Sequence, residues 1–312
     1  MEQFYAVLNQ VLIFLIIMII GFVSVKTKLL PDSALPGISR LFTRIIVPFI
    51  VFVNLVNGAT RADMREHFYL VGVYACLFVA LIAISRIKPK LIGIRGDRSP
   101  LFSLAMSFGN IGFIGIPLLL SVFGQGVMII VTMYYVVDQI LFWTYGLTLT
   151  YAAANRPKFT PKTLKNMINP SLIAVILAVM VVLFNIRLPR IVDSAFSSIS
   201  ISGMALPLIY LGALLATLDI KDLLKSYSAY AAILSKMIII PICAFLALRA
   251  IGLSPEIVAA STLLLGLPVI GMLPMLASAN GSDAEYATVL VLVMTLACVI
   301  TLPLVSYVTA LI

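Results

Sequence analysis

Long apolar runs recur along the whole chain and constrain its fold more than any other feature. A helix that crosses a bilayer needs about 20 mostly apolar residues, and ten segments of the 312-residue chain meet this requirement. They cover residues 5–25, 38–58, 67–85, 100–123, 127–151, 170–186, 193–217, 228–250, 255–279 and 285–311. The runs are continuous, whereas the strands of a membrane β-barrel alternate apolar with polar residues. The sequence therefore predicts an all-α membrane protein with ten transmembrane helices.

Composition and charge agree with this prediction. Apolar residues make up 62% of the chain and charged residues 11%, against about 25% charged residues in soluble domains. If the N-terminus lies outside, fifteen of the 21 Lys and Arg residues fall in cytoplasmic loops or at their flanks and five on the opposite side. The positive-inside rule explains such a bias without a nucleic-acid partner. We expect a multi-pass protein of the plasma or inner membrane with both termini extracytoplasmic.

Residues that could carry enzymatic or metal chemistry are sparse. Cys76, Cys243 and Cys298 all fall inside predicted spans without a CxxC spacing, and His67, the single histidine, falls at a predicted outer boundary. Intramembrane enzymes need acid pairs, Ser/His dyads or metal ligands, and cysteine spacing of this kind indicates neither a disulfide nor a zinc site. The sequence therefore predicts no enzyme, no cofactor and no metal.

The two halves of the chain resemble each other around their prolines. Pro48 in the second span corresponds to Pro207 in the seventh, and Pro117 in the fourth corresponds to Pro274 in the ninth, with offsets of 159 and 157 residues. Five spans per half reverse the direction of the second half, which gives an inverted repeat typical of secondary transporters. We expect repeats at residues 1–151 and 170–312 around a cytoplasmic loop at 152–169. Chance recurrence among the sixteen prolines is the alternative.

The fourth and ninth spans are poor continuous helices because they are rich in glycine and proline. Interruptions at matching places in two inverted halves indicate a binding site at the middle of the membrane. Each break exposes helix N–H groups that suit a carboxylate, and the amide of Asn110 could bind an anion or cap a half-helix. The candidate site residues are Asn110, Ile111, Gly112, Phe113, Gly115, Pro117, Pro268, Val269, Ile270, Gly271 and Pro274. Helix packing and proline kinks without a ligand are the alternative.

Three further polar residues fall inside predicted spans. Asp138 lies in the middle of the fifth span, where a carboxylate costs several kcal/mol on most estimates; it is a candidate for a coupling proton or cation, or for a structural hydrogen bond. Lys236 in the eighth span is a second coupling candidate, although snorkelling to the cytoplasmic surface is the favoured interpretation. Asn54 in the second span could line the substrate cavity, with helix packing as the alternative. Trp143 is interpreted as part of an interfacial aromatic belt.

These motifs resemble the auxin efflux carrier family. The family pattern Asn-x-x-x-x-Gly-[Ile/Leu]-Pro in the fourth helix matches Asn110 to Pro117, Pro48 matches a proline in the second helix, and Pro268 and Pro274 match a double proline in the ninth. The resemblance covers essentially the whole chain. The short 152–169 stretch replaces the long central loop of the plant members, and the third span lacks their Asp and Lys.

The resemblance implies the ten-helix fold shared with bile-acid symporters and sodium/proton antiporters. It implies a scaffold of spans 1, 2, 6 and 7, a moving transport core of spans 3–5 and 8–10, and helices four and nine that cross in that core. It also implies organic-anion substrates, auxin-like monocarboxylates or malate- and malonate-type dicarboxylates, carried by an elevator mechanism. A cation-coupled symporter of the bile-acid type is the alternative, a channel or sensor stays open, and the scaffold spans are where a homodimer would form.

Overall fold

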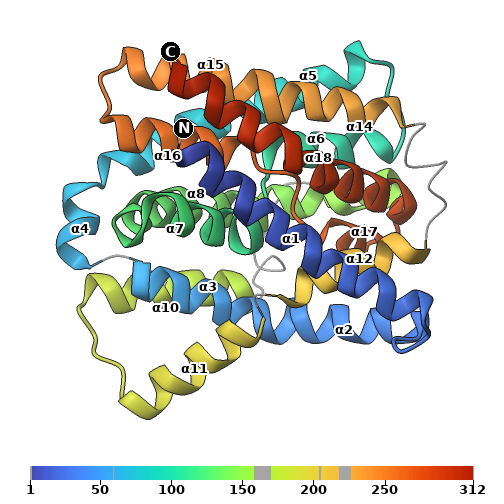
Figure 1. The fold of residues 1–312 in the computed structure, drawn as a ribbon, viewed down its shortest axis with the longest axis horizontal. Helices are drawn as coiled ribbons and strands as arrows, with labels where there is room; N and C mark the ends of the chain where they lie inside the picture. Colours follow the sequence, from blue (N-terminus) through green and yellow to red (C-terminus); the bar gives the residue numbers. More distant parts are fainter. Residues whose placement is uncertain (1, 59, 158–169, 204, 218–225, 312) are drawn as a thin grey trace.

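The described part of the chain folds almost entirely into helices (Figure 1). The structure is a computed structural model that describes residues 2–58, 60–157, 170–203, 205–217 and 226–311. Its α-helices are α1 (Glu2–Lys26), α2 (Leu35–Leu41), α3 (Val47–Gly58), α4 (Arg61–Glu66), α5 (Tyr69–Leu91), α6 (Arg98–Ser107), α7 (Ile116–Phe123), α8 (Met128–Thr144), α10 (Pro170–Leu183), α11 (Arg190–Ser202), α12 (Leu206–Thr217), α14 (Tyr227–Ala232), α15 (Ile240–Ala250), α16 (Pro255–Leu265), α17 (Leu273–Ala279) and α18 (Ala284–Leu311). Most of the expected central loop, residues 158–169, lies outside the described residues.

Six helical stretches among the described residues are long and apolar enough to cross a membrane. They are Tyr5–Lys26, Tyr69–Leu91, Gln125–Thr144, Arg190–Thr217, Tyr227–Ala250 and Ala284–Leu311. Shorter apolar helices cover Arg44–Gly58, Ile111–Phe123, Pro170–Leu183 and Pro255–Leu265, where the other four spans are expected. The chain is therefore an all-α membrane protein, and two of the short helices are halves of the interrupted spans.

Two of the expected spans are divided into two helical segments in the structure. The fifth was expected to run from 127 to 151, but α8 ends at Thr144 and a 3₁₀-helix follows at Gly146–Thr150. The seventh was expected to be one helix, but α11 ends at Ser202 and α12 begins at Leu206. Gly203 lies at that second break, where an added Cβ would overlap Ile46 and come within 2.8 Å of Ile50 on α3, so the absent side chain lets α3 approach closely.

Three segments of wider π-helix share one sequence context. They are η2 (Phe42–Ile46), η3 (Ile111–Gly115) and η7 (Ile233–Ile239). Each ends two residues before a proline, at Pro48, Pro117 and Pro241 respectively. Proline lacks an N–H and its ring crowds the carbonyl four residues back, and a wider turn relieves that crowding. A proline thus follows each of these changes of pitch, whereas Pro303 lies inside α18 without one.

A close helix–helix contact joins α1 to α12, and a pair of glycines makes it possible. A Cβ added to Gly212 would overlap the carbonyl oxygen of Met18, and a Cβ added to Gly21 would overlap that of Ile209. Small residues at a helix crossing allow such backbone contact in membranes, where packing rather than hydrophobicity drives association. The extensive α1–α12 interface and the similar α3–α10 interface hold this side of the molecule together.

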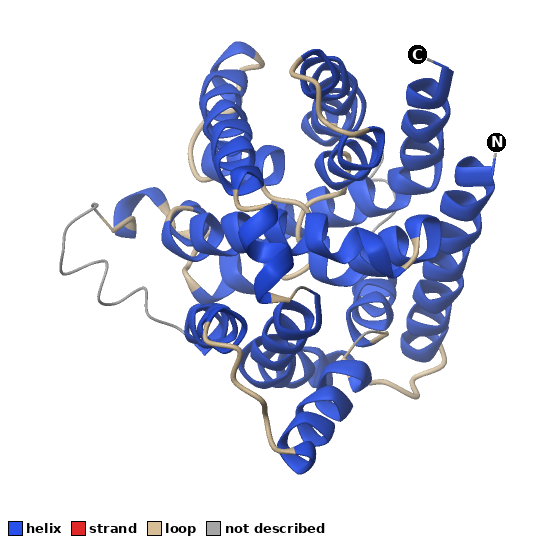
Figure 2. Ribbon diagram, turned by 90° about the vertical axis from the view of Figure 1, so that its left-hand side faces the viewer, coloured by secondary structure: helices blue, strands red, loops and turns tan. Residues whose placement is uncertain are grey.

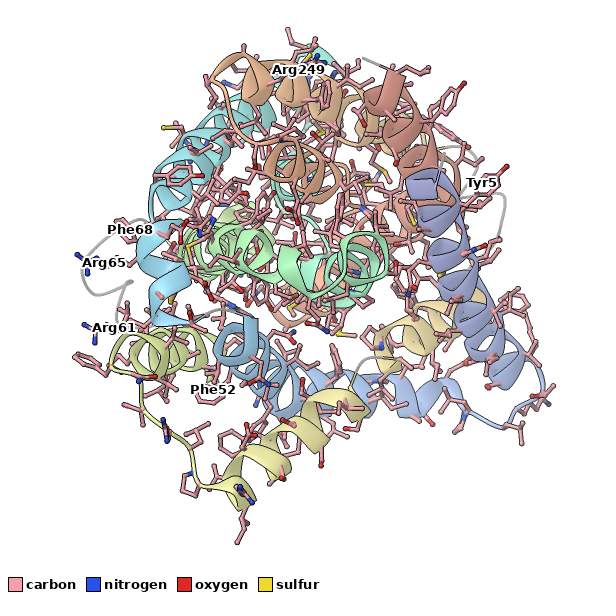
Figure 3. The ribbon with its side chains drawn as sticks, turned by 60° about the vertical axis from the view of Figure 1, so that its left-hand side comes forward. Tyr5, Phe52, Arg61, Arg65, Phe68 and Arg249 are labelled. Atoms are coloured by element: carbon pink, nitrogen blue, oxygen red, sulfur yellow. The ribbon has the colours of Figure 1, made fainter. Side chains whose placement is uncertain are left out.

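The outer surface carries the apolar side chains that lipid requires. On α1, Ile13, Ile16 and Ile20 are each about half exposed. The start of α1 and the end of α18 lie on the same side of the molecule (Figures 1 and 2). Arg61 and Arg65 of α4 point away from the helix bundle (Figure 3), and exposed Phe68 follows them. Basic and aromatic side chains of this kind are typical of a membrane interface.

Candidate functional site

The interruptions of the fourth and ninth spans meet inside the protein. The helix α6 ends at Ser107, and Phe108 continues in extended conformation. Gly109 then pairs with Val269 in an isolated antiparallel bridge, and the backbone N–H of Asn110 donates to the carbonyl oxygen of Pro268 at 2.8 Å. Backbone inside a membrane protein must find such partners because lipid supplies none. Both expected breaks are therefore present, and they contact each other.

One proline, Pro117 of the fourth span, lies at a different place from the one expected. Pro117 was expected within the interruption, but it lies at the start of α7, after the π-helix η3. Pro274 likewise lies at the start of α17, whereas Pro268 lies within the break itself. The first turn of a helix tolerates proline because its N–H would lack a partner there in any case. Pro117 and Pro274 thus start the second half-helices.

The side chain of Asn110 is the most unusual polar group at this junction. It is 1% exposed, and neither Oδ1 nor Nδ2 has a hydrogen-bond partner. The expected helix cap is wrong, since the side chain makes no cap hydrogen bond to η3. More than about 90% of buried polar groups in proteins are paired. An amide left with both ends unpaired therefore points to a partner that binds from outside the chain.

A small cavity of about 20 Å³ lies against Asn110, with room for about one water molecule. Five of the predicted site residues line it, namely Asn110, Ile111, Gly112, Phe113 and Ile270. The other lining residues were not predicted from the sequence; they are Val47, Ile50, Gly109, Tyr135, Gln139 and Met272. The cavity therefore lies between α3 on one side and the two breaks with α8 on the other.

The remaining predicted site residues do not line this cavity. Asn54 lies one turn beyond Ile50 on α3, with a buried Nδ2 that has no partner. Gly271 faces a neighbouring cavity, and Pro274 lines a larger one at the surface. The backbone of Pro268 and Val269 forms the contact between the breaks. A Cβ on Gly115 would approach Leu267 at 2.7 Å, so this glycine serves close packing.

A chain of hydrogen bonds leads from the cavity to Asp138. The Nε1 of Trp143 donates to Oε1 of Gln139 at 3.0 Å, and Nε2 of Gln139 donates to Oδ2 of Asp138 at 2.9 Å. Trp143 and Asp138 are buried, at 6% and 2% exposure. The interpretation of Trp143 as part of an aromatic belt is therefore wrong, because its indole is committed to this interior chain. Asp138 does have the structural hydrogen bond that was one of its two expected roles.

Lys236 is fully buried, at 0% exposure, and its Nζ has no hydrogen-bond partner. The snorkelling interpretation is therefore wrong. Lys236 lies nine residues after the start of the helical stretch Tyr227–Ala250, which is about 14 Å along a helix axis, farther than its side chain reaches. Lys236 and Asp138 act on each other electrostatically through the interior.

Three cavities form a series that leads from the surface to Asn110. The outer cavity, of about 560 Å³, includes Asp32, Arg40 and Tyr210 among its walls. Tyr210 and Met275 are shared with a middle cavity of about 10 Å³. Phe113 and Met272 are shared between the middle cavity and the one at Asn110. The middle cavity thus shares walls with both the outer cavity and the one at Asn110.

Two aromatic side chains form part of the wall of the middle cavity next to Asn110. The rings of Phe42 and Phe113 lie 4.8 Å apart between centroids at an angle of 48°, and both side chains are almost fully buried. Phe42 belongs to the π-helix before α3, and Phe113 to the π-helix after the break. Only a solute about the size of water fits at Asn110 while these rings stay in contact.

Comparison with known proteins places the chain in a family. A search of curated proteins finds no match. A family profile described as a membrane transport protein matches residues 6–306, which is nearly the whole chain. The match covers every helix that builds the junction at Asn110. The chain therefore belongs to the auxin efflux carrier family of membrane transporters.

Proposed function

We propose that the protein is a secondary transporter that moves small organic anions across the cell membrane, with the substrate carboxylate held at Asn110. The observation that carries this proposal is the pair of unpartnered polar atoms on a buried asparagine at a helix break. Leaving a buried amide unpaired costs about 1–3 kcal/mol for each group. A carboxylate bound to Nδ2 would recover part of that cost, which is the physical reason for it to bind here.

The helix that follows Asn110 strengthens the attraction for an anion. The stretch Ile111–Phe123 is continuously helical, and the N–H groups of its first turn have no acceptor within their own helix. The positive end of the helix dipole lies at the same place. The second half-helix of the ninth span, α17, has only seven residues, so we assign the anion to the Asn110 side and not to both helices.

The packing of the helices supports a division into a scaffold and a moving transport core. The first, second, sixth and seventh spans contact one another through α1–α12, α3–α10 and α3–α11. The remaining spans contact one another through α5–α6, α15–α16 and α17–α18, and α1 packs across the boundary between the groups against α18 and α7. The cavity at Asn110 takes Val47 and Ile50 from the first group and its other walls from the second. Sliding of the second group against the first would carry the bound anion across, as in an elevator.

The two halves of the chain also support an inverted repeat. Pro48, Pro117, Pro207 and Pro274 are each the second residue of a helix, namely α3, α7, α12 and α17. This shared position fits the two pairs that the sequence offsets relate. We propose repeats at residues 1–151 and 170–312, with both chain ends extracytoplasmic and the outer cavity facing the cytoplasm. The basic side chain of Arg40 in that cavity would attract anions towards it.

A ligand screen tests the proposed site directly. Purified protein is heated with acetate, indole-3-acetate, malonate or malate, and the unfolding temperature is compared with that of the unliganded protein. At least one carboxylate should raise it, because a ligand that binds only the folded state stabilises that state. Asn110→Ala should weaken binding about tenfold or more, since a hydrogen bond to a charged group contributes about 1.5–3 kcal/mol.

The matched control for the screen is Asn57→Ala, which removes an exposed asparagine of α3. Its response to the carboxylates should equal that of the unchanged protein. A carboxylate that stabilises Asn110→Ala as strongly as the unchanged protein would refute the site. Uptake of the stabilising carboxylate into proteoliposomes, with and without sodium, then separates the organic-anion carrier from a sodium-coupled symporter.

Phe42 should control access to this site. Phe42→Ala removes one ring of the pair that separates the middle and inner cavities, so it should let bulkier acids bind. It should also lower the free energy of unfolding by about 3–5 kcal/mol, as buried Phe→Ala changes do. Phe245→Ala, at a similarly buried position on α15, is the control that should lose stability without a change in ligand preference. Equal ligand preference in both variants would contradict the gating role.

A further inference from the structure

Two ionisable groups buried behind the anion cavity each have an unpartnered atom. Asp138 uses Oδ2 for its bond with Gln139, but its Oδ1 has no partner. The Nζ of Lys236 has none either. Burying a charged group is costly unless it is paired and hydrogen-bonded. Burial of both groups without their full set of hydrogen bonds therefore lowers the stability of the fold. A cost of this kind suggests that the two groups serve a function.

The two groups are each other's charged neighbours. Lys236 is the one charged group that acts on Asp138 among the described residues, and Asp138 is the one that acts on Lys236. The other titratable side chains that interact electrostatically with Asp138 are the phenols of Tyr134 and Tyr135 on α8. Behind them on α5, Tyr74 packs against Tyr134 and shares a 2.9 Å hydrogen bond with Ser261. The described residues thus supply no other charged side chain that acts on either group.

Gln139 connects this pair to the anion cavity. Its side chain lines the cavity at Asn110, and the same amide donates to Asp138 and accepts from Trp143. A carboxylate accepts the amide N–H strongly, whereas a protonated carboxyl group has its own O–H to donate. Protonation at Oδ1 removes the charge of Asp138 and so weakens the bond that Oδ2 accepts from Gln139, which changes how firmly the amide in the cavity wall is held.

We propose that Asp138 and Lys236 form a proton-binding pair that couples anion transport to a proton gradient through Gln139. The proposal rests on the proposed function, since the coupled substrate is the anion at Asn110. A proton from one aqueous side forms an O–H bond with the Asp138 carboxylate, no other bond breaks, and Lys236 stays an ammonium. The pair changes from neutral to one positive charge, which balances one carboxylate. On the other side the O–H bond breaks, and the proton leaves with the anion.

The charge of Lys236 argues for a proton in preference to a metal ion. An inorganic cation at Asp138 would lie near the ammonium of Lys236, and like charges close together in the interior repel strongly. Asp138 already uses one oxygen for the amide of Gln139, whereas hard cations need several oxygen ligands. A proton needs one lone pair, which the free Oδ1 supplies. The resulting transport of a monocarboxylate is electrically neutral, whereas a dicarboxylate carries one negative charge with it.

Infrared titration of the purified protein tests proton binding without any substrate. The carbonyl band of a protonated carboxyl group should grow as the pH falls, and Asp138→Asn should remove that part of the signal. In Lys236→Met the band should persist to higher pH, because the ammonium that favours the carboxylate is gone. Asp193→Asn, which changes an exposed acid of α11, is the control that should keep the band. A folded protein without an Asp138-dependent band at any pH overturns the proposal.

Proteoliposomes with an internal pH dye test the coupling, with labelled indole-3-acetate and malonate as the probes. An inward proton gradient should accumulate the transported probe and acidify the lumen, and Gln139→Met should reduce this response about tenfold. In Asp138→Asn the gradient should drive no accumulation. Uptake that ignores the proton gradient overturns the coupling alone. Absence of uptake for both probes counts against the proposed function and, with it, the coupling.

Discussion

Gly212→Ala should destabilise the protein by about 1–3 kcal/mol, although glycine-to-alanine changes inside helices usually stabilise. The added Cβ would overlap the carbonyl oxygen of Met18 on α1, and a backbone atom cannot move aside as the end of a flexible side chain can. The helices must separate, and the reciprocal contact of Gly21 with Ile209 is lost with them. Overpacking of this kind costs about 1–3 kcal/mol. Thermal unfolding of the purified protein in detergent measures the effect.

Gly72→Ala is the matched control for this change. Gly72 lies within α5, and no atom lies within 4 Å of the position where its Cβ would be added. Alanine should therefore raise stability there by up to about 1 kcal/mol, the difference in helix propensity. Gly21→Ala should behave like Gly212→Ala. Equal unfolding temperatures for the Gly72 and Gly212 variants would show that α1 and α12 do not touch through these glycines.

Lys236→Met should cost about 3–5 kcal/mol of stability at neutral pH, although methionine fills the space of lysine well. The substitution leaves the Asp138 carboxylate buried without its compensating charge, and losses of this size follow when one partner of a buried pair is removed. The loss should shrink as the pH falls, because a protonated Asp138 carries no charge to bury. Unfolding temperatures at several pH values measure both effects.

The double variant Asp138→Asn/Lys236→Met separates charge from packing. Removal of both charges together is often neutral or stabilising by about 1–4 kcal/mol, so the double variant should be at least as stable as the unchanged protein. The interaction energy from the four-protein cycle then reports the coupling between the two side chains. Additive losses in the double variant would show that the two groups do not compensate each other.

The sequence predicted the membrane class and the two breaks because both depend on local composition. Continuous apolar length decides whether a segment suits lipid, and glycine with proline decides where a helix weakens. The positions of Asn110 and Pro268 followed from this, and the structure places them in contact. What the prolines do was harder to predict, since Pro117 starts a helix after a wide turn instead of interrupting one.

The environment of a side chain depends on how a helix is rotated, and here the sequence carried little information. Helices such as α3 and α8 are apolar on nearly every side, so periodicity does not reveal which face is buried. Val47, Ile50 and Gln139 were missed for this reason, and Lys236 was placed in the wrong environment. The spacing of Tyr135 and Gln139, four residues apart on one helix face, was the available signal. It became informative only once α8 was seen beside the breaks.

The three π-helical segments determine how far three functionally placed side chains can move. Phe42, Phe113 and Lys236 each lie inside one of them. Each residue of a helix accounts for about 100° of rotation about its axis. If one π-helical turn changes to α-helical hydrogen bonding, every side chain that follows it therefore rotates by about that angle. The helix need not melt for this to happen. The protein thus has points where a helix can rotate beside the Phe42–Phe113 contact and at Lys236. Rotation at the first changes access to the cavity at Asn110, and rotation at the second changes the surroundings of the buried ammonium group.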